Sequence, residues 1–253
     1  MEKNFNYKEI DPQGHETLDV IAAAVHFNRW LYKTIAPYCK GKVLEIGSGS
    51  GNISHFFMED GYSIFLSDIR DIYCNILKEK FSGNTNLLGI ENMDLIDKNF
   101  ENRYAEHIGS FDTVFALNVV EHIADDALAI CNAKKLLAAG GRLIILVPAY
   151  QWLYNRFDEE LYHYKRYSKK RLCSLFQVND IAVKHSFYFN AFGMLGWFVS
   201  GKLMKKKTIP KSQMNFYNKI IPLAKLIDKI LFQQIGLSVI VVGEKNKLAS
   251  LPN

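Results

Sequence analysis

The sequence predicts an α/β fold with a doubly wound parallel sheet. Short, almost wholly apolar segments alternate with helix-length stretches of mixed polarity, as expected for parallel strands covered on both faces. A glycine-rich turn follows the first apolar segment, and polar residues end the next three. That arrangement is typical of the ligand-binding edge of an open α/β sheet.

The expected elements follow one another along the chain. A stretch of helical periodicity, residues 17–39, ends near Pro37 and precedes the first strand. The predicted strands are residues 42–47, 62–68, 86–94, 111–118, 142–150, 181–190 and 237–245. The predicted helices between them are residues 52–60, 69–81, 124–138 and 168–177. Strand–helix alternation of this kind indicates βαβ units.

The 253 residues suit a single domain with an elaborated end. We expect an N-terminal helical cap at 1–41, a Rossmann-like core at 42–190 and 236–246, and a helical insert at 191–235. Apolar residues recur at helical spacing from Phe216 onward, and Pro222 indicates a kink or a helix start near residue 221.

Composition excludes several classes of protein. Apolar residues make up 49% and charged residues 23%, which is ordinary for a globular domain. The four cysteines are far apart and form no CxxC pair, so we predict reduced thiols, no disulfide framework and no metal site. The N-terminus has no apolar signal core. A cytoplasmic location is the expectation.

The turn "KVLEIGSGSGNIS" (42–54) is the first candidate binding site. Its glycines allow positive φ and a close approach of the backbone to a ligand: they are Gly47, Gly49 and Gly51. A dinucleotide site prefers G-x-G-x-x-G, but the sixth position here is Asn52. Glu45 lies two residues before the first glycine, and a carboxylate there suits a cationic ligand better than a pyrophosphate. S-adenosylmethionine carries an ammonium and a sulfonium and no phosphate.

Polar residues also end the next three strands. Asp68 can accept both hydroxyls of a ribose, which suits NAD and S-adenosylmethionine alike. Asp94 can accept from an adenine amino group, and "LNVVEHI" places Asn118, Glu121 and His122 at the same edge of the sheet. The order and spacing of these groups favour one shared crevice.

These motifs together resemble the class I S-adenosylmethionine-dependent methyltransferases over about residues 28–190. "VLEIGSGSGNIS", "LSD", "ENMDL" and the run "FDTVFALNVVEHI…LIILVPAY" look like their successive motifs. The resemblance implies seven strands, the last antiparallel, with S-adenosylmethionine as donor and S-adenosylhomocysteine as product. It also implies that the donor is bound by Glu45, Gly47, Ser48, Gly49, Gly51, Asp68, Ile69, Asp94, Leu95 and Asn118.

The resemblance also narrows the acceptor. Enzymes that methylate exocyclic amines of DNA bases usually carry Asn/Asp-Pro-Pro-Tyr/Phe where this chain has "NVVEHI" (118–123). Relatives with the latter form act on small molecules, lipids, glycans or metabolites. We therefore expect such an acceptor and no nucleic acid.

The stretch after the fifth strand, "PAYQWLYNRFDEELYHYKRYSKKRL" (148–172), is the candidate acceptor loop. Its core resembles a bacterial methyltransferase subgroup with an Asp followed by Gly-His-Tyr-Arg-Arg-Tyr-Ser, although residue 162 is Tyr where the subgroup has Gly. His163 has the pKa best suited to remove an acceptor proton. The candidate catalytic residues are His163, Tyr167 and His122. The candidate substrate-binding residues are Tyr154, Asp158, Tyr164, Arg166 and Trp197. A structural alternative is that Ser168 caps a helix and the basic residues after it are solvated.

The insert is the basic part of the chain. Residues 191–235 carry eight lysines and one acid, a net charge of +7, whereas the whole chain has +5. Its apolar stretch is shorter than a membrane span. We expect a lid over the substrate pocket; the alternative is peripheral contact with the inner face of an anionic membrane and a lipid-linked acceptor.

Three functions are compatible with the sequence. The first is O- or N-methyl transfer to a small-molecule, glycan or lipid-linked acceptor. The second is an NAD(P)-dependent oxidoreductase, which Glu45 and Asn52 disfavour. The third is a non-catalytic S-adenosylmethionine-binding protein. The sequence does not predict the oligomeric state.

Overall fold

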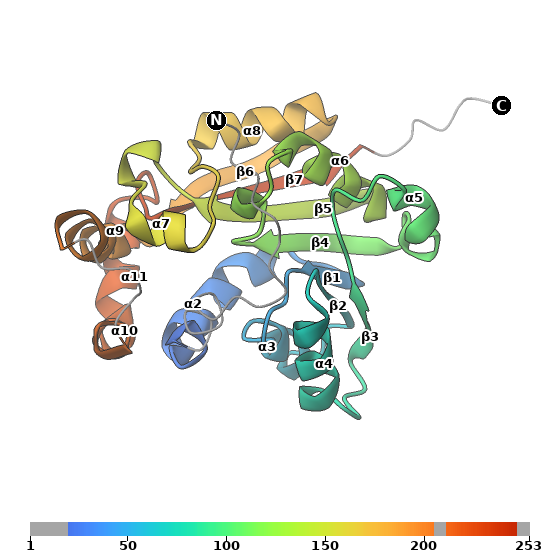
Figure 1. Ribbon diagram of the computed structural model, residues 1–253, viewed down its shortest axis with the longest axis horizontal. Helices are drawn as coiled ribbons and strands as arrows, with labels where there is room; N and C mark the ends of the chain where they lie inside the picture. Colours follow the sequence, from blue (N-terminus) through green and yellow to red (C-terminus); the bar gives the residue numbers. More distant parts are fainter. Residues whose placement is uncertain (1–19, 205–210, 247–253) are drawn as a thin grey trace.

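Seven strands form one sheet in the order β3-β2-β1-β4-β5-β7-β6 (Figure 1). The computed structural model describes residues 20–204 and 211–246. The strands are β1 (Val43–Ile46), β2 (Ile64–Asp68), β3 (Leu87–Asn92), β4 (Phe111–Leu117), β5 (Leu137–Pro148), β6 (Ile181–Phe189) and β7 (Ser238–Lys245). β7 pairs antiparallel with both β5 and β6, and the other pairs are parallel. The predicted Rossmann-like sheet with an antiparallel last strand is confirmed.

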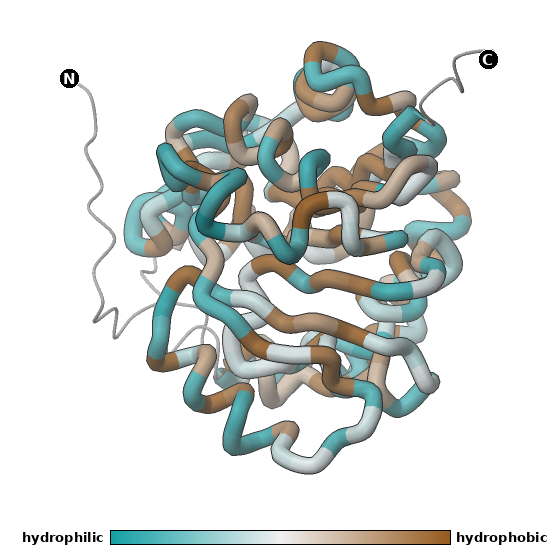
Figure 2. Tube along the Cα trace, turned by 90° about the vertical axis from the view of Figure 1, so that its right-hand side faces the viewer, coloured by the Kyte–Doolittle hydropathy of each residue, from teal (hydrophilic) through white to brown (hydrophobic). Residues whose placement is uncertain are grey.

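Helices cover both faces of the sheet. Those of the core are α2 (Val25–Ile35), α3 (Ser54–Glu59), α4 (Asp71–Lys80), α5 (Phe100–Arg103), α6 (Asp126–Leu136), α7 (Arg156–Glu160) and α8 (Lys169–Val178). Short 3₁₀ turns are η1 (Ala36–Tyr38), η2 (Ala105–His107), η3 (Val120–His122) and η4 (Gln151–Leu153). One buried cluster joins the strands to α5, α6 and α8, and the other joins them to α2, α3 and α4. Hydrophobic and hydrophilic residues alternate along the outer helices, as one-sided packing requires (Figure 2).

Two boundaries differ from the sequence prediction. β5 begins at Leu137 instead of residue 142, because the chain turns extended directly after α6 and pairs Leu137 with Phe111. A register shift then restores the pairing of Arg142 with Thr113. The helix expected over 17–39 appears as α2 followed by η1. Residues 1–19 of the predicted cap lie outside the described residues.

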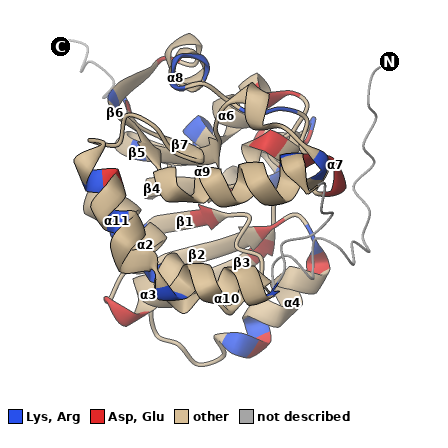
Figure 3. Cartoon of the chain, turned by 90° about the vertical axis from the view of Figure 1, so that its left-hand side faces the viewer, with Lys and Arg blue, Asp and Glu red and all other residues tan. Residues whose placement is uncertain are grey.

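The insert is helical in its described part, as predicted. It contains α9 (Ala191–Trp197), the π-helical η5 (Phe198–Leu203), α10 (Lys211–Lys219) and α11 (Ile221–Ile230). Pro222 lies in the first turn of α11, which confirms a helix start near residue 221. The ribbon of α9 carries no charged residue, whereas α11 carries lysines (Figure 3). Lys205, Lys206 and Lys207 lie outside the described residues.

Asp228 holds this insert to the sheet. Its carboxylate accepts from the backbone amides of Asn190 and Ala191, each at 2.7 Å, where β6 passes into α9. Asn190 has φ +68° and caps α9 by accepting from the Gly193 amide at 2.8 Å. The only acidic residue of the insert sequence therefore has a structural role, because it binds the backbone where β6 meets α9. Within the described ranges, no helix is long and apolar enough to cross a membrane.

Candidate functional site

A cavity of about 320 Å³ lies where β1, β2 and β4 end, which is the expected ligand position in an open α/β sheet. Nine of the ten residues predicted to hold the donor line it: Glu45, Gly47, Ser48, Gly49, Asp68, Ile69, Asp94, Leu95 and Asn118. Gly51 does not line it. A Cβ at Gly51 would lie 2.5 Å from the ring of Phe81, so this glycine makes room for a core aromatic side chain.

The glycine turn brings its backbone against the cavity. Gly47 has φ +72° and Gly49 has φ +52°, in the left-handed region that favours glycine. A Cβ at Gly47 would lie 2.4 Å from the Cγ2 atom of Val119. Both the backbone conformation and the lack of space therefore disfavour any side chain at Gly47.

Asp68 ends β2 with its carboxylate already oriented. One oxygen accepts from the Gly49 amide at 2.9 Å and the other from the Arg70 amide at 3.0 Å. Burial raises its pKa, while these amides counteract part of that rise. Each carboxylate oxygen retains a lone pair, so two further hydroxyl groups can donate to it.

Glu45 lies buried beneath the turn and accepts a hydrogen bond from the Ser54 hydroxyl. Burial raises the pKa of Glu45 to about 8, with Ser54, Ser48 and Lys80 opposing the rise and Asp68 adding to it. A cation bound in the cavity would favour the ionised form.

Asp94 and Asn118 are fixed by the backbone at the two sides of the cavity. Asp94 accepts from the Ile96 amide at 2.9 Å and donates its own amide to the Tyr104 hydroxyl at 2.9 Å. Asn118 has φ +55° and donates its backbone amide to the Leu146 carbonyl at 2.9 Å. Both residues therefore lie just beyond the ends of β3 and β4, where they line the cavity.

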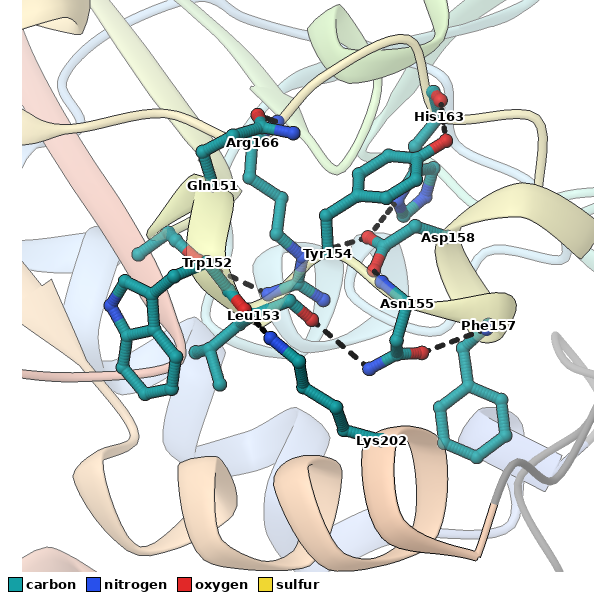
Figure 4. Close-up of polar contacts among 11 residues, drawn as sticks. Gln151, Trp152, Leu153, Tyr154, Asn155, Phe157, Asp158, His163, Arg166 and Lys202 are labelled. Atoms are coloured by element: carbon teal, nitrogen blue, oxygen red, sulfur yellow. Dashed lines mark hydrogen bonds and ion pairs between the residues drawn. The ribbon is translucent and has the colours of Figure 1, made fainter.

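The acceptor loop is organised by Asp158 (Figure 4). One carboxylate oxygen accepts from His163 Nδ1 and from Arg166 Nε, each at 2.8 Å, and the other accepts from the Asn155 amide at 3.0 Å. Burial alone would raise the pKa of Asp158, but the hydrogen bond from His163 and the charge of Arg166 lower it below its ordinary value. Tyr154 donates its hydroxyl to the His163 carbonyl at 2.8 Å. The loop thus fixes the imidazole of His163.

Two histidines reach the cavity from different elements. His122 ends η3 and His163 belongs to the acceptor loop, and both line the cavity. Their ring centroids lie 4.7 Å apart with the rings nearly perpendicular. Burial lowers the pKa of both imidazoles. They are therefore neutral near pH 7, and each keeps one nitrogen lone pair.

Glu121 precedes His122 and is fully buried. Burial raises its pKa to about 8. Within the described part of the chain, neither of its carboxylate oxygens has a hydrogen-bond partner.

Six of the eight residues predicted to act on or bind the acceptor do not line the cavity: Tyr154, Asp158, Tyr164, Arg166, Tyr167 and Trp197. Arg166 is buried, donates to the Ala149 carbonyl at 3.1 Å and stacks on Trp197 with its guanidinium carbon 4.6 Å from the ring centroid. Tyr167 is buried in the core and donates its hydroxyl to Asp126 at 2.9 Å. Tyr164 donates its amide to the Glu121 carbonyl at 2.8 Å. These placements favour structural roles, because the partners lie within the fold.

The chain matches known methyltransferases over this region. Residues 44–143 match the family described as "Methyltransferase domain". Over this stretch, which is less than half of the chain, the sequence is similar to a methyltransferase domain. Class I methyltransferases use S-adenosylmethionine, which becomes S-adenosylhomocysteine. The domain covers the glycine turn, the ends of β2, β3 and β4, and the first part of β5.

Three relatives show how far the similarity extends. A ubiquinone biosynthesis O-methyltransferase of Xanthomonas oryzae is 27% identical over 107 residues, 41% of each chain. A hybrid PKS-NRPS synthetase of Penicillium citrinum is 32% identical over 109 residues, 42% of this chain and 3% of the synthetase. The structure of phosphoethanolamine N-methyltransferase 2 of Haemonchus contortus matches 87% of this chain and 52% of its own, with a TM-score of 0.58 at 14% identity. The chain therefore spans less than half the length of these curated relatives, and the structural match shows a shared fold.

Several cavity residues of the methyltransferase domain and its surroundings were not predicted. They include Ile21, Phe27, Arg70, Tyr73, Met93 and Tyr162. Tyr162 has φ +59°, the left-handed region, at the position where the related loop has glycine. The glycine of the related loop was the one indication that residue 162 adopts this backbone conformation. The others come from α2, α4 and loops whose approach depends on packing.

Proposed function

We propose that this chain transfers the methyl group of S-adenosylmethionine to a hydroxyl or amine of a small-molecule acceptor. One observation carries the proposal: a single cavity is lined by nine of the predicted donor residues and by the neutral imidazoles of His122 and His163. Donor and acceptor chemistry thus share one space. A methyltransferase needs this proximity, because nucleophile, methyl carbon and sulfur must lie in line.

The donor would lie across the ends of β1 to β4. The two carboxylate oxygens of Asp68 would accept the ribose hydroxyls, and Ile69 and Leu95 would flank the adenine next to Asp94. The methionine part would lie against the Gly47–Gly49 backbone, with its positive charges favouring ionised Glu45. Asn118 would line the sulfonium region.

His163 is the proposed general base. Its Nδ1 donates to Asp158, which leaves the Nε2 lone pair as the acceptor of a proton. The acceptor oxygen or nitrogen then forms a bond to the methyl carbon while the carbon–sulfur bond breaks, and the electron pair passes to sulfur. His122 lies beside this base and would contact the acceptor.

The remaining loop residues would position the base. Asp158 and Arg166 fix the ring of His163, and Tyr154 fixes its backbone. We assign this loop to the bacterial subgroup with the Gly-His-Tyr-Arg-Arg-Tyr-Ser motif, because Tyr162 adopts the conformation that a glycine would favour. Glycans and lipid-linked acceptors belong to the classes that relatives with the "NVVEHI" form methylate, so the screen includes them.

The proposal is tested with labelled S-adenosylmethionine and a panel of hydroxyl- and amine-bearing acceptors. We expect His163→Ala to reduce turnover at least about tenfold, since general bases contribute about 10²–10⁴-fold, with little change in donor affinity. His185→Ala on β6 is the matched control and should retain wild-type turnover. Equal turnover of the His163 variant and the wild type would remove His163 from the mechanism. Donor binding with no transfer across the panel would favour a non-catalytic protein.

A second proposal concerns the insert. None of its described residues lines the cavity, so the surface of α11 is free for another role than a lid over this cavity. Leu223, Leu226 and Ile230 are 49%, 53% and 62% exposed and lie on one side of α11, which also carries Lys225 and Lys229. Exposed apolar residues flanked by lysines suit an anionic membrane surface.

Flotation with phosphatidylserine-containing vesicles tests this contact. Leu226→Asp should reduce flotation, whereas Val178→Asp, at a 71% exposed position on α8, should not. Absence of flotation by the wild-type chain would contradict the membrane proposal.

A further inference from the structure

Three side chains of the kinds that ligate metal ions lie close together beside the cavity. They are Glu121 and His122 of η3 and His163 of the loop after α7. His122 and His163 are 41 positions apart in sequence, and their two segments are joined by the hydrogen bond from the Tyr164 amide to the Glu121 carbonyl, at 2.8 Å. The fold, and not local sequence, therefore places the three together.

The donor atoms are close enough to share one ion after a small adjustment. One carboxylate oxygen and one nitrogen from each histidine all lie within 4.8 Å of one another. Ligands about 2.1 Å from a tetrahedral ion lie about 3.4 Å apart, so closing the site needs side-chain movements of about 1 Å. Rotation of the side chains about their χ angles supplies a movement of this size.

The buried carboxyl group of Glu121 is an independent indication of a ligand site. The residue is 0% exposed, and neither carboxylate oxygen accepts a hydrogen bond from another described residue. Burying an unpartnered carboxyl group is costly. Arg166 donates to Asp158 and Ala149, and no hydrogen bond joins its guanidinium to the Glu121 carboxylate.

The surroundings of His163 match those of a metal ligand. Its Nδ1 hydrogen-bonds to the Asp158 carboxylate at 2.8 Å, which directs Nε2 away from that carboxylate. Ligating histidines in proteins commonly make such a bond through the other ring nitrogen. Two imidazoles and one carboxylate suit Zn²⁺ and similar ions better than Mg²⁺ or Ca²⁺, which prefer oxygen ligands.

We propose that Glu121, His122 and His163 bind one divalent transition-metal ion beside the cavity. Three protein ligands leave a position open on the ion, and the two histidines line the cavity. An acceptor molecule can therefore reach that position.

The catalytic role of the ion rests on the proposed function, whereas ion binding does not. The acceptor's hydroxyl oxygen binds the ion, which lowers the pKa of that hydroxyl. The O–H bond breaks and the proton passes to water, because both histidine lone pairs are on the ion. The oxygen then bonds to the methyl carbon as the carbon–sulfur bond breaks with its electrons passing to sulfur. In the metal-loaded enzyme, this step replaces proton removal by His163.

Co²⁺ is the probe, added to the chelator-treated full chain in the absence of donor. Visible absorption reports its coordination, and calorimetry reports stoichiometry and affinity. We expect one Co²⁺ per chain, displaced by Zn²⁺ and not by Mg²⁺. Glu121→Gln keeps the shape of the side chain and should lower Co²⁺ affinity by more than the ~10–100-fold typical of losing an outer-shell group.

The matched control is a partly exposed acid–histidine pair elsewhere in the fold, Glu91 with His107. Glu91→Gln and His107→Asn should leave Co²⁺ binding at the wild-type level. Should Glu121→Gln not fold, His122→Asn and His163→Asn provide the same test, with melting temperature as the check on folding. No Co²⁺ binding by the wild type, or equal binding by folded Glu121 and His122 variants, would overturn the proposal.

Turnover separates this inference from the proposed function. Glu121 does not line the cavity, so Glu121→Gln lowers turnover only if the ion takes part. Unchanged turnover in that variant, with transfer still dependent on His163, would contradict the catalytic role of the ion and leave the base mechanism standing. Failure of the metal-free wild type to bind S-adenosylhomocysteine would instead contradict the proposed function.

Discussion

Replacing Glu45 by glutamine should remove a pH dependence from donor binding. The carboxyl group of Glu45 is buried under the glycine turn, and its pKa is raised to about 8. It is therefore mostly protonated in the free protein below that pH. The positive charges of S-adenosylmethionine favour the ionised form, so binding expels a proton and donor affinity rises with pH.

The size of the effect follows from the pKa. At pH 7, a carboxyl with a pKa of about 8 is protonated in about nine molecules in ten. If the bound donor returns that pKa to its ordinary range, each binding event releases about 0.9 proton at pH 7. Donor affinity then rises about tenfold from pH 6 to pH 7 and only about twofold from pH 8 to pH 9.

Calorimetry in buffers of different ionisation enthalpy measures the released protons. The other groups that act on Glu45 are Ser54, Ser48, Asp68 and Lys80, and Glu45→Gln leaves all four in place. The variant should bind S-adenosylmethionine with much less proton release and a flatter pH profile. Proton release near zero in the wild type at pH 7, or equal release in the variant, would refute the reasoning.

Three further predictions concern the backbone. Gly47→Ala should lower the free energy of unfolding, measured in urea, by about 1–2 kcal/mol, because φ is +72° at this position. A variant as stable as the wild type would contradict this. Asp228→Ala leaves the buried amides of Asn190 and Ala191 unpaired, at about 1–3 kcal/mol each, whereas Asp228→Asn keeps an acceptor and should lose less. Equal losses would be the contrary result. Tyr162→Gly should match or exceed wild-type stability while Tyr162→Val falls below it, because φ is +59°; the reverse order would be inconsistent with that backbone.

The sheet and the donor side of the cavity were predictable for one physical reason. Parallel strands present their carboxyl ends at a single edge, so residues that end successive strands meet in space. Correct strand assignments were enough to place three residues at the cavity: Asp68, Asp94 and Asn118. The start of β5 was missed because "LAAGG" has neither helical nor strand periodicity, and its pairing with β4 decides its conformation.

The acceptor loop could be predicted only in part. His163 reaches the cavity as expected, but Arg166 and Tyr167 turn inward because Asp158 and Asp126 offer buried carboxylates. Those partners depend on the packing of distant segments, which spacing within the loop does not specify. The unpaired state of Glu121 was likewise invisible in the sequence, since it depends on what surrounds the side chain.

Calorimetry of the wild type and of Asp68→Asn with S-adenosylhomocysteine, S-adenosylmethionine and NAD tests the central claim most directly. Asp68 is the carboxylate at the end of β2 that faces the cavity. We expect one donor site per chain, no NAD binding, and an affinity about 10–150-fold lower in the variant, as expected for a lost charge-assisted hydrogen bond. NAD binding without binding of S-adenosylmethionine would contradict it.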